Sequence, residues 1–282
     1  MTSLSIFTTM TNPDTRNDPW REAISCYEFF ANEVVVVGDD WPEEFTWDHI
    51  GKTFQEGYEK CTSDWVMRMD IDYFLHQKDK YKLYKTLEKY KDYPVISLPQ
   101  YQIFTPDRYQ IKTRLCLVFN KKKYKNIVLN GGGDLTLATI NGELIDPKKT
   151  PMVNIPIYQY ESTFRTKEIL EQDRARFARA WFRYFNTYES RGGSTPEGAY
   201  NAWFEEIKKR YPKHSFRLNI EDHPKFIINK LSALDDNQFG KSAFGLADIT
   251  KFEKKYYIKG LREKYLNPII YKNNKQHYLN NG

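Results

Sequence analysis

The chain has 282 residues, 40% of them hydrophobic, which is enough for one large domain or two small ones. The net charge of +6 is concentrated in residues 251–282, which hold eight Lys or Arg and two Glu, so the rest of the chain is neutral. A neutral body argues against a nucleic-acid binder. No stretch is long and apolar enough to predict a transmembrane segment.

The cysteines and the N-terminus predict a cytoplasmic protein. Cys26, Cys61 and Cys116 are widely separated and form no CxxC pair, which is typical of reduced, buried residues. Residues 1–10 lack a positive region followed by an apolar run, so we expect no signal peptide.

Extended and helical patterns alternate from the N-terminus. Residues 4–9 form a short β-like run, and Asp18-Pro19 predicts a helix with Asp18 as N-cap. The β-branched run Val34–Val37 is typical of a parallel strand covered on both faces. This run ends at Gly38-Asp39-Asp40, which places two carboxylates directly after a strand.

The same alternation continues after Thr46, where a second helix is expected to begin. A strand is predicted at 65–69, and it ends at Asp70-Ile71-Asp72. A helix over 80–90 and extended runs at 95–104 and 111–120 follow.

This β-α-β-α-β-α-β order predicts an α/β fold with a mostly parallel sheet flanked by helices. Ligands of such sheets bind beyond the carboxyl ends of the strands. Three polar clusters follow predicted strands: Thr8-Thr9, Asp39-Asp40, and Asp70 with Asp72. We therefore expect these clusters to converge on one site.

The second half of the chain is expected to be mainly helical. A hairpin is predicted around Asn141-Gly142, followed by a long helix over 166–188 and another capped by Thr195-Pro196. These patterns suggest a catalytic domain over residues 1–230 and a basic, Tyr-rich arm over 231–282. We expect the arm to dock an acidic partner, a membrane surface or another subunit.

Asp70-Ile71-Asp72 is the central candidate for chemistry. Residues two apart at a strand end can reach one ion, and carboxylate oxygens suit Mg²⁺ or Mn²⁺. Such an ion neutralises the charge on a leaving diphosphate. A solvated turn, or a helix N-cap at Asp72, is the alternative interpretation.

On these residues the chain resembles the GT-A glycosyltransferases, broadly those of family two. Val34–Asp40 resembles the family's "VVDDGS" stretch, and Gly51–Asp72 resembles its helix, strand and DxD segment. Leu115–Asp134 is similar to the strand before its "GGFD" loop, and Glu171–Trp181 to its "ED" helix. The resemblance covers Leu4–Ser190. Among the subgroups of the family, the chain resembles the small GT-A domains encoded by large algal viruses.

The resemblance implies the residues of a donor site. Thr8 and Asp39 would hold the nucleotide base and ribose, Asp70 would touch ribose or metal, and Asp72 would bind metal. Members of the family often add a His from the C-terminal part as a metal ligand, which points to His223. A surface or helix-capping role is the alternative for His223.

Two acidic residues are candidates for the catalytic base. The resemblance implies that Asp134 lies near the donor sugar and that Asp173 deprotonates the acceptor. Ile169, Asp173 and Phe177 also share one helical face, where burial would raise the pKa of Asp173 and suit it to proton abstraction. The alternative for Asp173 is a salt bridge to Arg165 or Arg176. The chain departs from the family pattern in the longer interval between these two residues.

Arg68 precedes the DxD by two residues and is a candidate contact for the diphosphate. The alternatives are a pair with Asp64 and a place at the rim of the sheet.

These observations predict a metal-dependent glycosyltransferase of the hexosyltransferase type. It would move a sugar from a UDP- or GDP-type donor to a hydroxyl of a glycan or glycoprotein, with Mn²⁺ or Mg²⁺ as cofactor. A nucleotidyltransferase is the alternative enzyme, but residues 8–18 hold one Arg and lack the Gly-rich loop expected there. A non-catalytic sugar- or partner-binding module of the same fold is the other alternative.

Overall fold

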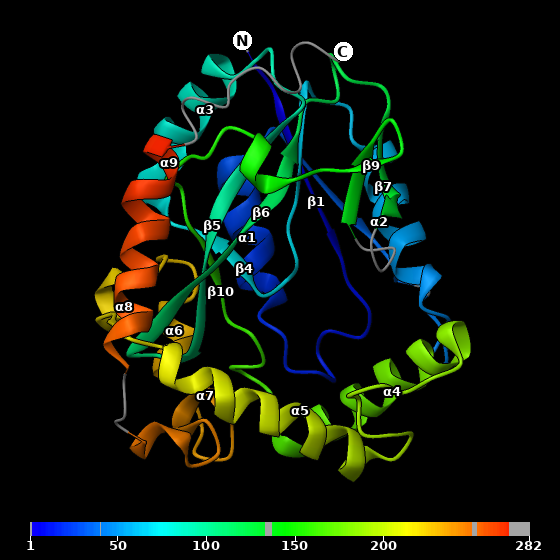
Figure 1. Ribbon diagram of the computed structural model, residues 1–282, viewed down its shortest axis with the longest axis vertical. Coiled ribbons are helices and arrows are strands. Elements are labelled where there is room, and N and C mark those ends of the chain that lie inside the picture. The colour runs from blue at the N-terminus through cyan, green and yellow to red at the C-terminus, as the bar shows by residue number, and fades with distance from the viewer. Residues whose placement is uncertain (1, 40, 133–136, 250–252, 271–282) are drawn as a thin grey trace.

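The computed structural model describes residues 2–39, 41–132, 137–249 and 253–270. In this part of the chain a central sheet has helices on both faces and a second, small sheet beside it (Figure 1). The predicted α/β fold class is therefore confirmed. The helices that follow residue 166 form the expected helical C-terminal part.

The central sheet has eight strands within the described residues. In spatial order they are β2 (Glu33–Val37), β1 (Leu4–Thr9), β3 (Trp65–Arg68), β6 (Arg108–Phe119), β5 (Val95–Thr105), β10 (Ile157–Gln159) and β4 (Tyr73–Leu75), with β11 (Phe216–Arg217) paired to β6. The N-terminal strands β1, β2 and β3 lie together, so the loops that follow β1 and β3 meet at one edge.

The sheet is mixed, whereas the pattern predicted a mostly parallel one. The pairs β1–β2, β1–β3 and β5–β10 are parallel, and the other described pairs of this sheet are antiparallel. The reason lies at Pro106-Asp107, because a connection of two residues can join only antiparallel neighbours. The long strands β5 and β6 form this hairpin.

Helices cover the two faces of the sheet. They are α1 (Trp20–Phe30), α2 (Asp48–Lys60) and α3 (Lys80–Lys89). Successive residues of β1 point to opposite faces of the sheet. Ile6 packs in one core cluster with residues of α1 and α3, and Phe7 packs in another with residues of α2. Gly57 lets α2 approach β1 closely, since a Cβ there would lie 2.4 Å from the Phe7 ring.

The second sheet extends the core around α2. Its strands are β7 (Ile127–Gly132), β8 (Leu137–Ile140) and β9 (Glu143–Leu144). The predicted hairpin at Asn141-Gly142 is confirmed, and both residues have positive φ, 53° and 80°. Ile127 and Leu129 of β7 pack in the same cluster as α2.

Two long helices, α4 (Lys167–Phe185) and α5 (Pro196–Arg210), lie across the end of the sheet (Figure 1). Both begin at hydroxyl caps: Thr166 accepts from Ile169 N, and Thr195 accepts from Gly198 N at 3.2 Å. The predicted cap at Thr195-Pro196 is therefore confirmed.

The C-terminal residues form α6 (Ile228–Ser232), α7 (Phe239–Ser242), α8 (Lys254–Leu261), a π-helical turn (Arg262–Leu266) and α9 (Asn267–Ile270). The expected boundary between residues 230 and 231 falls inside α6. Leu231 belongs to the main core, and Phe239 packs with Phe104 of β5. The first part of the expected arm is therefore part of the folded body.

The predicted helix cap at Asp18 is wrong. The first helix begins at Trp20 without a side-chain cap, and the Asp18 carboxylate instead accepts two bonds from Arg165 at 2.9 and 2.7 Å. Arg165, which is distant in the sequence, donates these two charge-assisted hydrogen bonds, and Asp18 therefore does not cap the helix.

Two further expectations concern the three cysteines and the membrane. Cys26, Cys61 and Cys116 are free thiols, the first two buried and the third half-buried. Among the described residues, no helix has the length and apolar character that crossing a membrane requires.

Candidate functional site

A cavity of about 300 Å³ lies where β1 and β3 end. The loop after β1 contributes Thr9–Thr11, and the loop after β3 contributes Asp70–Asp72. Residues after β10 and side chains of α4 close the other walls. The cavity lies beyond the carboxyl ends of two parallel strands, where ligands of α/β sheets bind.

One wall of the cavity is apolar and mostly aromatic. It is lined by Trp41, Phe45, Ile50, Phe54 and Phe177. The rings hold one another edge-on, with Trp41 and Phe45 centroids 5.1 Å apart and Phe45 and Phe177 centroids 5.4 Å apart. The Nε1 of Trp41 is buried and has no hydrogen-bond partner among the described residues. This wall suits the face of a planar ring.

Asp70 and Asp72 line this cavity together, as the DxD spacing predicted. The backbone carbonyl of Asp70 accepts bonds from Tyr27 Oη at 2.6 Å and Tyr73 N at 2.7 Å, which fixes the turn. Burial raises the pKa of the Asp72 carboxyl to about 7, and the Asp70 charge adds to this rise while Arg165 opposes it. No described residue forms a hydrogen bond or ion pair with the Asp72 carboxylate.

The two carboxylates alone do not make up a full set of protein ligands for a metal ion. Within the described residues, no group of three or more His, Cys, Asp or Glu side chains is placed to hold an ion. Mg²⁺ commonly binds proteins through one or two carboxylates and completes its shell with water and substrate phosphates. The hard oxygen donors of Asp70 and Asp72, and the raised pKa of Asp72, fit such an ion.

His223 does not have the role expected for it. Its side chain is fully buried, its Nδ1 lies 2.8 Å from Tyr160 Oη, and its Nε2 lies 2.7 Å from the carbonyl oxygen of Pro106. Both ring nitrogens are thus occupied, so the expectation that His223 ligates the metal is corrected. It joins the β5–β6 turn to the segment after β10.

Asp173 lies in a different environment from the one expected. Its Oδ2 accepts bonds from Arg165 at 2.7 Å and Arg16 at 3.1 Å. Burial alone would raise its pKa, but the charges of Arg16 and Arg165 outweigh burial and hold the pKa below its usual value. The expected upward shift is therefore wrong, and the ion pair with Arg165 that the sequence left open is present. Asp173 lines a second cavity.

The other expected donor contacts that the structure describes do not line the cavity. The side chain of Thr8 is fully buried, and the cavity is lined instead by Thr9 and the two residues after it. Asp39 lies exposed on the turn after β2. Arg68 stacks on Phe54 at 4.3 Å and lies 3.7 Å from the Asp70 carboxylate, so it supports the wall from behind. Asp134 lies outside the described residues.

Four arginines that the sequence did not single out as ligands line the cavity: Arg16, Arg165, Arg174 and Arg176. Arg165 is held by Asp18 and Asp173, but the buried Nε of Arg174 has no hydrogen-bond partner in the described chain. The sequence signal was Asp173-Arg174-Ala175-Arg176, whose arginines lie in the third turn of α4. Arginine planes suit phosphate oxygens.

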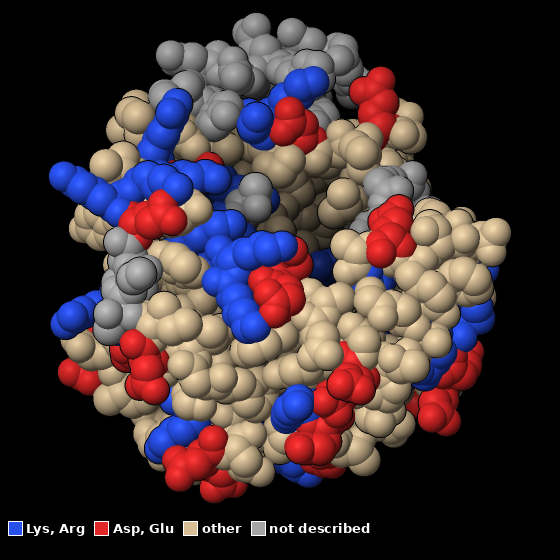
Figure 2. Space-filling model, turned by 60° about the horizontal axis from the view of Figure 1, so that its bottom comes forward, with Lys and Arg blue, Asp and Glu red and all other residues tan. Residues whose placement is uncertain are grey.

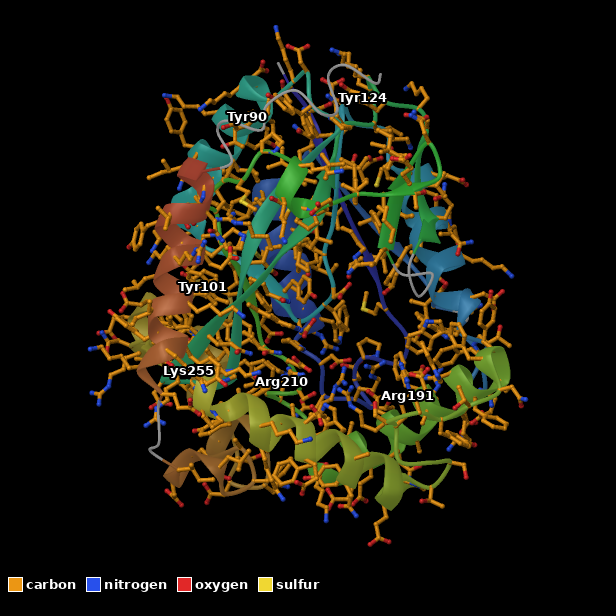
Figure 3. The ribbon with its side chains drawn as sticks, viewed as in Figure 1. Tyr90, Tyr101, Tyr124, Arg191, Arg210 and Lys255 are labelled. Carbon is orange, nitrogen blue, oxygen red and sulfur yellow. The ribbon has the colours of Figure 1, made fainter. Side chains whose placement is uncertain are left out.

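Glu161 is the third acid that lines the cavity, and sequence reasoning missed it. It accepts bonds from Gln102 Nε2 and from Arg210 at 2.9 Å. Burial would raise its pKa, but Arg210, Lys112 and Arg174 lower it below the usual value. Figure 3 labels Arg210 where α5 faces the sheet. Glu161 is thus compensated within the protein, in contrast to Asp72.

A second cavity of about 500 Å³ adjoins the first. The two cavities share Arg16, Trp41 and Arg176 as lining residues. The remaining lining of the second cavity is mostly polar and includes Asn12 and Gln172. The hollow visible at the centre of Figure 2 opens between groups of charged side chains.

No family model matches the chain, and no curated protein matches it. Among solved structures the chain is similar to TarS from S. aureus. A structure of TarS residues 1–349 has 9% identity and a TM-score of 0.32, over 98% of this chain and 93% of that one. A longer TarS structure has 9% identity and a TM-score of 0.33, over 94% of this chain and 49% of that one. The activity of this chain is therefore inferred from its own site.

Proposed function

We propose that the protein is a metal-dependent, GT-A-like glycosyltransferase that uses a nucleotide diphosphate sugar as donor. One observation carries the proposal: two carboxylates at the end of β3, one of them without a protein partner among the described residues, face a cavity that also offers arginines and an aromatic wall. A nucleoside diphosphate bound with a divalent ion matches each of these features.

Asp70 and Asp72 would hold Mn²⁺ or Mg²⁺. When bound, the ion neutralises the charge that develops on the leaving diphosphate. Two ligands from the protein leave coordination positions for phosphate oxygens and water, as is usual for Mg²⁺. Ionised carboxylates cost free energy in this partly buried site, and a bound cation would remove that cost.

The aromatic wall would bind the planar base of the nucleotide. Trp41 lies at the boundary of the two cavities, where its ring can cover a stacked base. The guanidinium groups of Arg174 and Arg176 line the same cavity and would contact phosphate oxygens. These contacts orient the donor and exclude water from its anomeric carbon.

The acceptor would approach through the second, more polar cavity, because that cavity meets the first at Arg16, Trp41 and Arg176. Within the described residues, Asp173 and Glu161 both have lowered pKa values and are weak bases. The role of base therefore stays with Asp134, as a prediction from the family pattern.

A thermal-shift panel tests this function. A ligand that binds only the folded state increases the free energy of unfolding, by about 2.7 kcal/mol when its concentration is a hundred times Kd. The melting temperature rises accordingly. For a chain of this size that is a shift of roughly 5 to 10 °C. We expect UDP or GDP and their sugars to give this shift with Mn²⁺ and little shift with chelator.

Two outcomes would overturn the assignment to glycosyl transfer. If nucleoside triphosphates stabilise the protein and diphosphates do not, nucleotidyl transfer is favoured. If a nucleotide sugar binds but is neither transferred to any glycan nor slowly hydrolysed, the site serves binding alone. Where Asp72→Asn is tested for loss of this binding, the control for general charge effects is Asp107→Asn, which changes an exposed acid on the β5–β6 turn.

A further inference from the structure

The helical segment at residues 254–270 is held firmly on the sheet. Arg114 of β6 is buried and donates from its Nη2 to the carbonyl oxygen of Glu263 at 2.9 Å, with its Nε 3.5 Å from the Glu263 carboxylate. Gly260 packs against Phe216, where a Cβ would lie 2.4 Å from the ring. The inner face of the segment is thereby fixed, and so is the direction of its outer face.

The outer face of this segment carries several exposed apolar side chains. Ile258, Tyr265, Leu266 and Ile269 are all exposed, Ile269 by 63%. Ile258 lies on α8, Tyr265 and Leu266 lie on the π-helical turn, and Ile269 lies on α9, so exposed apolar side chains form a stripe along the whole segment. Ordinary surface helices turn such a stripe toward the core. Here the stripe is exposed, and the core-facing side includes Gly260 and Glu263.

Cations lie among these apolar side chains. Lys254, Lys255, Lys259 and Arg262 are exposed, and Lys264 lies 5.2 Å over the ring of Tyr265. Of the acids in this segment, Glu263 is turned inward to Arg114. Glu253, just before the helix, pairs with Lys255. The outer face therefore carries a positive charge.

The position of this face on the molecule is visible from outside. Figure 1 places α8 and α9 along one flank of the sheet, and Figure 2 shows Lys and Arg side chains gathered on that same flank, beside the central hollow. Lys255 is labelled near the beginning of α8 in Figure 3.

We propose that the face formed by Ile258, Tyr265, Leu266 and Ile269 with the surrounding cations binds an anionic lipid surface. Apolar side chains at one level can enter the acyl boundary while lysines extend to the headgroups. Each cation near such a surface contributes about 1 kcal/mol, roughly a fivefold factor in affinity. The sequence continues with Lys272 and Lys275, which lie outside the described residues.

This inference is independent of the reaction proposed above, because it uses none of the residues of the two cavities. A second copy of the chain is the competing occupant of the apolar stripe. Cations spread through the stripe of both copies would repel one another in such a dimer, whereas they attract an anionic bilayer. Charge therefore favours the lipid surface.

The test is sedimentation of the full chain with vesicles. Vesicles of equal parts phosphatidylcholine and phosphatidylglycerol should bind the protein, and vesicles of phosphatidylcholine alone should bind it at least tenfold more weakly. Raising the salt concentration should weaken binding to the anionic vesicles. Lys255→Glu with Lys259→Glu should reduce their affinity by roughly twenty-five-fold or more.

Matched variants separate this face from general charge and hydrophobicity. Ile258→Ser with Leu266→Ser should reduce vesicle affinity at least tenfold, whereas Leu144→Ser, which changes an equally exposed residue of β9, should not. Lys209→Glu on α5 is the control for charge. Circular dichroism and urea unfolding check that each variant is folded.

Three results would overturn the proposal. The first is equal binding to neutral and anionic vesicles. The second is vesicle binding that the variants of the face leave unchanged. The third is an absence of vesicle binding together with self-association, measured by analytical ultracentrifugation, that Ile258→Ser with Leu266→Ser abolishes. The third result would assign the face to a dimer.

Discussion

Two carboxylates, Asp72 and Asp173, lie in adjoining cavities and have opposite environments. Asp173 accepts bonds from two guanidinium groups, and its pKa is lowered. Asp72 has no such partner among the described residues, and its pKa is raised to about 7. Arginines of the protein compensate the charge of Asp173, whereas no described residue forms an ion pair with Asp72.

Under the proposed function, this difference separates Asp173, an acid that stabilises the fold, from Asp72, an acid that would bind the metal ion. Arg165 bonds to Asp18 and to Asp173, so the network joins the loop after β1 to α4. Removing one member leaves buried charges without partners. Removing the charge of Asp72 relieves an unfavourable one. Mutations at the two positions should therefore change stability in opposite directions.

The largest effect is expected from Asp173→Ala. This change removes one of the two carboxylates, Asp18 and Asp173, that pair with both Arg16 and Arg165, and should reduce the free energy of unfolding by about 3 to 5 kcal/mol. Urea unfolding at pH 7.5 measures it. The matched control is Glu44→Ala, because Glu44 also bridges two arginines, Arg179 and Arg183, but at the surface.

The control should cost no more than about 1 kcal/mol, since exposed ion pairs contribute little. Equal losses for Asp173→Ala and Glu44→Ala would contradict the structural role that we give to Asp173.

Asp72→Asn is expected to stabilise the protein without ligand. An acid whose pKa rises on folding lowers stability when it ionises, so the cost is absent below about pH 4 and complete above about pH 7. At pH 8 the variant should gain on the order of 2 to 4 kcal/mol, and most of the gain should vanish at pH 4.5. Urea unfolding at both pH values measures the gain, and a loss of stability at pH 8 would refute the assigned environment.

The third effect is a pH dependence of ion binding. Metal ligands must be deprotonated, so a carboxyl with a pKa of about 7 limits ion affinity below that pH. The affinity for Mn²⁺ in the presence of UDP or GDP should fall about tenfold between pH 8 and pH 6. The same titration of Asp72→Asn corrects for protonation of the phosphates, and an equal fall in both proteins would exclude Asp72 as the ligand.

The smallest effect is expected from Trp41→Ala in the aromatic wall. Loss of a stacked ring should weaken binding of the nucleoside diphosphate by about fivefold to tenfold. Trp20→Ala is the matched control, because Trp20 is half-buried and bonds to Asp14 outside the cavity. If both variants bind as the unchanged protein does, the base does not rest on this wall.

The sequence predicted the features that depend on local pattern. The strand ends, the Asn141-Gly142 hairpin and the cap at Thr195 follow from side chains within a few residues, and all are observed. The pairing of Asp70 with Asp72 in one cavity also follows from strand geometry.

What the sequence did not predict depends on distant partners. Nothing near His223 indicates that Tyr160 and the Pro106 carbonyl would occupy its ring. Nothing near Asp173 indicates that Arg16 would reach it across 157 positions of sequence. The direction of a pKa shift is set by such contacts, and local spacing cannot supply them.

The central claim is that Asp72 and its neighbour Asp70 bind a divalent ion together with a nucleoside diphosphate. Isothermal titration of UDP and GDP into the protein, with Mn²⁺ and with chelator, at pH 7.5, tests this claim most directly. We predict that one of the two binds at least tenfold more tightly with Mn²⁺, and that Asp72→Asn loses this gain while remaining folded. Equal affinity with Mn²⁺ and with chelator, or an undiminished gain in Asp72→Asn, would contradict the claim.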